Sequence, residues 1–135
     1  MTAALLIDTH VLLWTRTGPE RLTPGERQVI EAAPIRYISC VSLWEFAILI
    51  GLGRIEVDER LMDVPDGYDL LPIKPDHCKA VATLPRHHRD PFDRMLVAQA
   101  QTERVSLLTR DRVIEAYRDH ATILRYPGTI RSAEA

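Results

Sequence analysis

The sequence predicts an α/β domain with a central, mostly parallel sheet. Short apolar segments alternate with segments of helical character along the chain, as parallel sheets require. The first segment, residues 4–7 (ALLI), is apolar throughout, which favours a strand covered on both faces. The 135 residues show no repeat, low-complexity tract or linker. We therefore expect a single domain over residues 1–135, with a core of about 4–126 and a frayed tail over about 127–135.

In the first half of the chain, residues that start or stop regular structure bound the expected elements. We expect a strand at 4–7, a helix from about 9 to 14, a helix at 24–33, a strand at 37–40 and a helix at 43–50. Thr23 followed by Pro24 is a typical N-cap and first residue of a helix. Ser42 is expected to cap the apolar helix behind it, with Glu45 completing a capping box and Gly51 ending that helix.

The second half continues the alternation. After a short helix or loop at 54–67, we expect a strand at 70–73, helices at 75–84 and 91–102, a strand at 105–108, a helix at 111–117 and a strand at 122–124. Pro75 begins the first of these helices, and Asp90 with Pro91 opens the second. Between those two helices lies a basic loop at 86–89 (RHHR).

Charge and hydropathy limit the classes of function. The formal net charge is −2, so overall charge would not hold a nucleic acid, and any such contact must use local basic patches or metal ions. The N-terminus has neither a basic region nor a long apolar region typical of a signal peptide. The longest apolar stretch, residues 41–52, is interrupted by Glu45 and is too short to span a bilayer. We expect a cytoplasmic protein without a membrane partner.

Three acidic residues stand in places that suit a functional site. Asp8 ends the first strand, and Asp111 follows the strand at 105–108. Ligands of open α/β sheets bind just beyond such strand ends. Glu45 is the charged residue of an otherwise apolar helix, where an unpaired charge is costly. Both aspartates could equally well be helix caps. For Glu45, considered without the other residues, the capping box is favoured over a functional site.

The helix at 91–102 carries two more aspartates near its start. Asp93 lies within the apolar stripe of this helix, whereas Asp90 directly precedes Pro91 and is the better candidate for the cap. All five carboxylates fall at strand ends or helix starts, which share one edge of a parallel sheet. Carboxylates that converge repel one another unless cations lie between them. Oxygen ligands favour Mg²⁺ or Mn²⁺, ions that polarise phosphoryl oxygens and activate water.

Four segments carry a family resemblance. They are residues 5–10 (LLIDTH), 42–45 (SLWE), 89–96 (RDPFDRML) with 98–100 (AQA), and 109–111 (TRD). In order and spacing, over about residues 4–126, the chain resembles PIN-domain proteins, specifically the VapC-type toxin ribonucleases of type II toxin–antitoxin pairs. The resemblance implies a PIN-like fold, with a central, mostly parallel sheet flanked by helices. It also implies an acidic quartet, with Asp90 as a candidate fifth member: Asp8, Glu45, Asp93 and Asp111.

The resemblance further implies an endoribonuclease that uses Mg²⁺ or Mn²⁺ to hydrolyse single-stranded or looped RNA. Such proteins usually form homodimers and are silenced by a cognate antitoxin. Asp8 and Asp111 would bind the metal directly, and Glu45 and Asp93 would complete the sphere directly or through water.

The segments around the quartet suggest supporting residues. Thr109 matches the family's hydroxyl residue near the metal. Arg89 and Arg94 are candidates for contacting the RNA backbone, although a solvated loop explains Arg89 equally well. His87 and His88 are not expected to bind the metal, because no His or Cys partner shares their spacing.

Two other functions remain open at this stage. One is a catalytically silent PIN module that acts only by binding protein, against which the intact quartet argues. The other is a phosphatase or phosphotransfer domain with Asp8 as nucleophile. Haloacid-dehalogenase-like enzymes need a second acid two residues later, where this chain has His10, and the lysine of receiver domains is missing at a late strand end.

Overall fold

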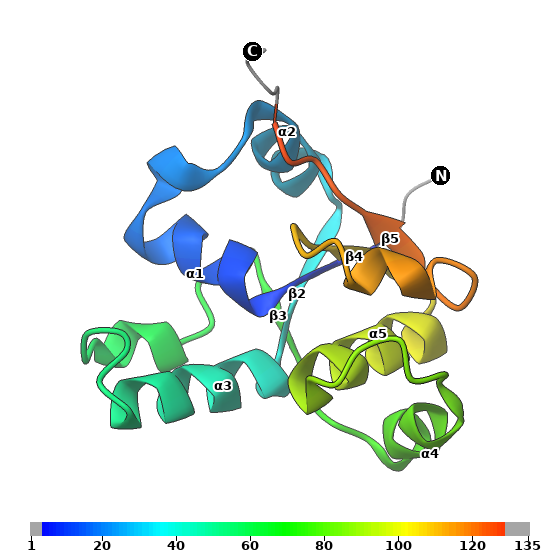
Figure 1. Ribbon diagram of the computed structural model, residues 1–135. Helices are drawn as coiled ribbons and strands as arrows, with labels where there is room; N and C mark the ends of the chain where they lie inside the picture. Colours follow the sequence, from blue (N-terminus) through cyan, green and yellow to red (C-terminus); the bar gives the residue numbers. More distant parts are fainter. Residues whose placement is uncertain (1–3, 129–135) are drawn as a thin grey trace.

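A five-stranded parallel sheet forms the centre of the computed structural model, which describes residues 4–128 (Figure 1). The strands lie in the order β3-β2-β1-β4-β5, and each pairs in parallel with its neighbours. The strands are β1 Ala4–Ile7, β2 Ile35–Ser39, β3 Asp69–Leu71, β4 Ser106–Leu108 and β5 Thr122–Leu124. β1 takes the central place, as its four buried apolar residues require. The predicted fold class is confirmed.

Helices cover both faces of this sheet. They are α1 Thr9–Thr17, α2 Pro24–Ala32, α3 Cys40–Gly51, α4 Pro75–Thr83 and α5 Pro91–Glu103. Successive residues of a strand point to opposite faces, so Leu6 packs in one core cluster with α5, while Leu5 and Ile7 pack in a second cluster with α1 and α2. None of the helices within residues 4–128 has the length and apolar character needed to cross a membrane.

The start of α3 differs from the prediction. The helix begins at Cys40, and Ser39 is its N-cap, with a hydroxyl that accepts a hydrogen bond from the Val41 backbone nitrogen at 3.0 Å. Ser42 is instead buried inside the helix, where its hydroxyl lies 2.8 Å from that of Thr9. The predicted capping box around Ser42 is therefore wrong, because β2 runs straight into the helix and supplies an earlier cap. Glu45 lies beyond the first turn of α3.

Other boundaries shift by a few residues. The predicted helix at 111–117 is a single 3-10 turn over Ile114–Tyr117, and another such turn, Glu59–Met62, lies in the 54–67 segment. The Thr23 cap of α2 is confirmed and forms a full capping box with Glu26. Most of the tail predicted to fray, residues 129–135, lies outside the described residues.

Candidate metal centre

The order of the strands creates a crevice at the carboxyl ends of β1 and β4. From β1 the chain builds the sheet outward through β2 and β3, whereas β4 and β5 extend it on the other side. Ligands of doubly wound sheets bind at this kind of reversal. Asp8 follows β1, and its backbone N–H donates to the Leu108 carbonyl at the end of β4. Residues distant in sequence thus meet at this edge.

Asp8 is a buried carboxylate with one satisfied oxygen. Only 4% of the residue is exposed, and Thr109 Oγ1 donates to Asp8 Oδ2 at 2.8 Å. Oδ1 is buried and has no hydrogen-bond partner. Burial raises the pKa of Asp8 above its ordinary value of 3.8. The Asp8 side chain makes no capping bond to α1, so the helix-cap alternative does not explain its position.

Glu45 approaches the same crevice from α3. Its Oε1 is buried without a hydrogen-bond partner, and the capping box that would have occupied it does not form. Burial raises the pKa of Glu45, and the nearby charges of Asp90 and Asp8 raise it further. An orphaned buried carboxylate oxygen is costly to a protein, so Glu45 is not explained by the fold alone.

Two aspartates lie at the start of α5 and have different surroundings. Asp90 is the N-cap, as predicted, and its Oδ1 accepts from the backbone nitrogens of Phe92 at 2.8 Å and Asp93 at 3.3 Å. The Asp93 side chain is instead buried toward the crevice. Burial, together with the charges of Asp8, Asp90, Glu45 and Asp111, raises the pKa of Asp93 to about 8. The predicted carboxylates therefore form one electrostatic cluster.

Asp111 and Thr109 close the cluster on the β4 side. Asp111 Oδ1 accepts from the Val113 backbone nitrogen at 2.9 Å. This hydrogen bond closes a turn at the place where a helix was expected to start. Thr109 Oγ1 accepts from the Asp111 backbone nitrogen at 3.0 Å while donating to Asp8. This single hydroxyl therefore holds the two aspartates that end β1 and β4 in a common arrangement.

His88 is a member of the cluster that the sequence reasoning did not find. Its Nε2 lies 2.9 Å from Asp93 Oδ2 and 3.2 Å from Asp111 Oδ2. One ligand atom from each of these three residues falls within 4.8 Å of the other two, which is a spacing able to hold a metal ion. The spacing of His and Cys residues does not indicate this position, because the partners of His88 are carboxylates.

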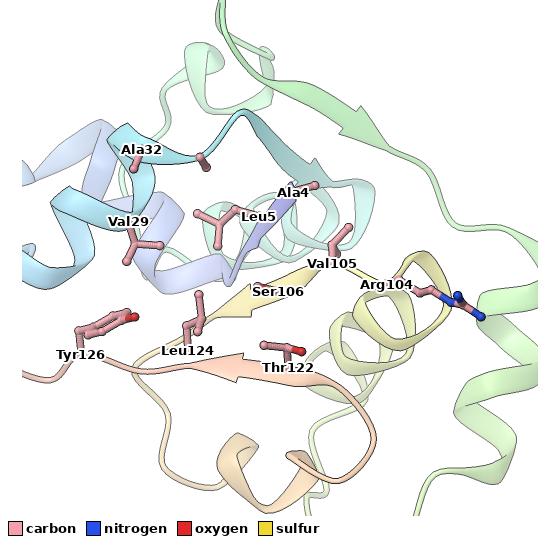
Figure 2. Close-up of a pocket in the computed structure, with 11 residues that line it drawn as sticks. Ala4, Leu5, Val29, Ala32, Arg104, Val105, Ser106, Thr122, Leu124 and Tyr126 are labelled. Atoms are coloured by element: carbon pink, nitrogen blue, oxygen red, sulfur yellow. The ribbon is translucent and has the colours of Figure 1, made fainter. Parts of the chain in front are cut away.

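An open hollow of about 420 Å³ gives access to the cluster. Its lining combines acidic, basic and aromatic side chains: Asp8, His10, Trp14, His88, Asp90, Asp93, Arg110 and Asp111. A larger hollow of about 510 Å³ lies between α2, the starts of β1 and β4, and β5 with Tyr126 behind it (Figure 2). That lining contains no carboxylate or histidine, so the chemistry is concentrated at the carboxyl edge despite the smaller volume.

Comparison with known proteins agrees with this architecture. The model of the PIN domain family matches residues 5–119. The chain belongs to the PIN-domain family. Ribonuclease VapC22 of Mycobacterium tuberculosis is 29% identical to it over 119 residues, which cover 84% of this chain and 92% of that protein.

Solved structures share the fold at lower identity. VapBC2 from Rickettsia felis, bound to a promoter DNA fragment, has a TM-score of 0.65 at 10% identity and covers 90% of this PIN domain and 98% of its own chain. VapBC from Salmonella typhimurium, bound to DNA, has a TM-score of 0.64 at 18% identity, with coverages of 93% and 98%. A toxin–antitoxin complex from Klebsiella pneumoniae has a TM-score of 0.62 at 19% identity, with coverages of 91% and 97%.

Two arginines near the start of α5 differ in their surroundings: Arg94 is hydrogen-bonded within the fold, and Arg89 is exposed. Arg94 donates to the carbonyls of Pro85 at 2.8 Å and Val81 at 3.2 Å, and to the Tyr117 hydroxyl at 3.0 Å, which ties α5 to the end of α4. Arg89 is exposed and lines a basic hollow with Arg94 beside the acidic one. Contact of either arginine with a substrate stays a prediction.

Arg110 is a second residue that sequence reasoning missed. Its guanidinium lies 4.2 Å above the ring of Trp14 and forms a two-pronged ion pair with the fully buried Glu26. Glu26 Oε1 also accepts from the Thr23 backbone nitrogen at 2.9 Å, within the capping box of α2. The pair fastens the loop of Thr109 and Asp111 to the start of α2.

Proposed function

We propose that this PIN domain is an endoribonuclease that depends on Mg²⁺ or Mn²⁺ and acts as the toxin of a toxin–antitoxin pair. The observation that carries the proposal is a cluster of carboxylates at the carboxyl ends of β1 and β4. Asp8, Asp93 and Asp111 line the hollow, and Glu45 lies near enough for its charge to act on Asp93. The similarity to a protein named a ribonuclease and to chains from toxin–antitoxin complexes supports it.

The residues present suit a divalent cation. Among residues 4–128, the buried side-chain polar atoms without a hydrogen-bond partner are Asp8 Oδ1 and Glu45 Oε1. Both are carboxylate oxygens of the kind that Mg²⁺ and Mn²⁺ prefer. A cation between the carboxylates would also offset the repulsion that raises the pKa of Asp93. Asp90 Oδ1 already caps α5, so this residue has a single oxygen left for a metal.

Each residue of the site has a part in the proposed hydrolysis. A divalent cation would supply a Lewis acid for the phosphoryl oxygens and would lower the pKa of water so that hydroxide is available as the nucleophile. Asp8 and Asp111 would hold that cation, and Thr109 orients both aspartates. Asp93 and Glu45 would contribute further oxygen ligands, directly or through water, and would orient the attacking water. The basic hollow that Arg89 lines, next to the acidic one, receives the phosphates of the RNA chain.

A protein partner is part of the proposal. Trp44 on α3 is 58% exposed, and beyond the helix Leu52 and Val57 are 64% and 77% exposed. Apolar side chains of this size at a surface favour contact with another protein. We propose that these exposed side chains contact a second copy of the chain or a cognate antitoxin. The proposed RNA substrate implies action in the cytoplasm.

The test is cleavage of RNA by the wild-type protein, by Asp8→Asn and by Asp66→Asn, each with Mg²⁺ and with a chelator. Asp66 is exposed in the turn before β3 and serves as the matched control. We expect metal-dependent cleavage by the wild-type and Asp66→Asn proteins and its loss in Asp8→Asn. Equal cleavage by all three proteins would refute the assignment of the site, and cleavage in the chelator would refute the metal dependence.

A further inference from the structure

We propose that His88 is a nitrogen ligand of the metal ion, so that one imidazole joins the carboxylates in the coordination sphere and the site prefers Mn²⁺ to Mg²⁺. The inference rests on the metal-dependent function proposed above. It adds a residue outside the acidic quartet, from the loop between α4 and α5, and it names the class of metal.

The first argument is the geometry around the imidazole. His88 Nε2 lies 2.9 Å from Asp93 Oδ2 and 3.2 Å from Asp111 Oδ2. Two ligands at right angles around a cation with bonds of about 2.1 Å are separated by about 3.0 Å. The two observed separations therefore match neighbouring corners of one coordination sphere. Asp8, whose Oδ1 is buried and without a hydrogen-bond partner, lines the same hollow but is not one of the three residues whose ligand atoms lie within 4.8 Å of one another.

The second argument is that the backbone of His88 is held in place. Its N–H donates to the Tyr117 hydroxyl at 3.0 Å, and that hydroxyl donates to the Pro85 carbonyl at 3.0 Å. Tyr117 is fully buried and also receives a hydrogen bond from Arg94. The His88 side chain is 18% exposed. A histidine held this firmly against two carboxylates is unlike one on a solvated loop.

The tautomer of His88 decides whether Nε2 can bind a metal. Nδ1 lies 3.5 Å from the Asp90 backbone nitrogen, at the outer limit of a hydrogen bond. This contact is too weak to force the proton onto Nε2. The competing arrangement is a ring that carries its proton on Nε2 and only donates to Asp93 and Asp111. The experiment below separates the two arrangements.

The chemistry of the donor set indicates the metal. A neutral imidazole adds a ligand without adding negative charge to a hollow that Asp8, Asp93 and Asp111 already line. Imidazole nitrogen suits transition metals, whereas Mg²⁺ favours oxygen ligands and water. His88 therefore favours Mn²⁺ over Mg²⁺, in contrast to a site built from carboxylates alone.

The experiment is pulsed electron paramagnetic resonance of the protein loaded with Mn²⁺ alone, with calorimetric titration of Mn²⁺ and of Mg²⁺. The variants are His88→Gln and, as a control, the double variant His10→Gln/His87→Gln. The control removes the other histidine of the hollow and the exposed neighbour of His88. We expect nitrogen coupling to Mn²⁺ in the wild type and the control, and none in His88→Gln. We also expect His88→Gln to weaken Mn²⁺ binding by at least about tenfold, with a smaller effect on Mg²⁺.

Each outcome decides between specific alternatives. Mn²⁺ that binds the wild type without nitrogen coupling would overturn the ligand role of His88 and leave the proposed nuclease intact. Loss of coupling in the double variant would also overturn it, because the nitrogen would then come from His10 or His87. Failure of Mn²⁺ and Mg²⁺ to bind any of the proteins would overturn the metal-dependent function as well. If His88→Gln fails to fold, loss of nitrogen coupling in the double variant, or its absence from the wild type, still overturns the proposal.

Discussion

Replacing Asp93 with asparagine should stabilise the protein when no metal is bound. The pKa of Asp93 is raised from its ordinary value of 3.8 to about 8, because the carboxyl is buried and faces four other carboxylates. Asparagine keeps the shape of the protonated carboxyl and its oxygen can still accept from His88, but it carries no charge. The variant therefore removes a repulsion and leaves the packing of α5 unchanged.

The sign and size of the effect follow from linkage. Below about pH 4 Asp93 is protonated in both the folded and the unfolded chain, so its ionisation does not change stability. Above that pH the unfolded chain ionises first, which favours unfolding until the pH passes about 8. Each pH unit in this window lowers the free energy of unfolding of the wild type by at most about 1.4 kcal/mol. The stabilisation that Asp93→Asn can recover at pH 7 is therefore at most about 4 kcal/mol. His88 contacts Asp93 at 2.9 Å and offsets part of this cost in the wild type. We therefore expect Asp93→Asn to raise the free energy of unfolding by about 1–3 kcal/mol at pH 7.

The assay is urea denaturation of the wild type and Asp93→Asn in a chelator at pH 5, 6, 7 and 8, with Asp66→Asn as a control for loss of an exposed carboxylate. The stabilisation by Asp93→Asn should grow across this series, and the control should stay within about 0.5 kcal/mol of the wild type. A variant that is less stable than the wild type at pH 7, or a difference that does not grow with pH, would refute the reasoning.

Three further predictions concern the supports of the site. Mg²⁺ at 100 times its Kd should stabilise the wild type by about 2.7 kcal/mol, and Asp8→Asn should respond less; equal shifts of the melting temperature would contradict the site. Thr109→Val should cost about 1–3 kcal/mol in chemical denaturation, because Asp8 Oδ2 and the Asp111 backbone nitrogen lose their partner. An unchanged unfolding midpoint would show that these hydrogen bonds are dispensable. Glu26→Gln should cost about 3–5 kcal/mol by leaving the partly buried Arg110 without its counter-charge, and a calorimetric loss below 1 kcal/mol would contradict that role.

The aspartates at the strand ends were predictable because local sequence determines their position. Asp8 follows four apolar residues, and a run of that kind can lie only in the interior of the sheet. The strand before Thr109 is similar, so the edge at which Asp8 and Asp111 meet follows from parallel topology alone. Asp90 as the cap of α5 was predictable for the same reason, since Pro91 fixes the first residue of that helix.

The start of α3 was not predictable from the local sequence. Ser39 and Ser42 are both good N-caps, and the choice depends on how far β2 pairs with β3, where Ser39 is the last partner of Leu71. The position of His88 depends on Tyr117, which is 29 residues away in the chain. Such long-range contacts leave no periodic signal, so the sequence does not indicate that His88 lies beside Asp93 and Asp111.

The ion pair between Glu26 and Arg110 makes the site preorganised. Glu26 Oε1 accepts from both the Thr23 backbone nitrogen and Arg110, and Oε2 accepts from Arg110, so the start of α2 is tied to the residue next to Asp111. The conformational entropy of the loop that carries Asp111 is therefore lost when the chain folds, not when a metal or an RNA arrives. A ligand that binds a loop already fixed in this way does not have to order it, so a smaller part of the interaction free energy is offset by lost entropy. The order of this edge thus depends on a buried glutamate that lies outside the acidic hollow.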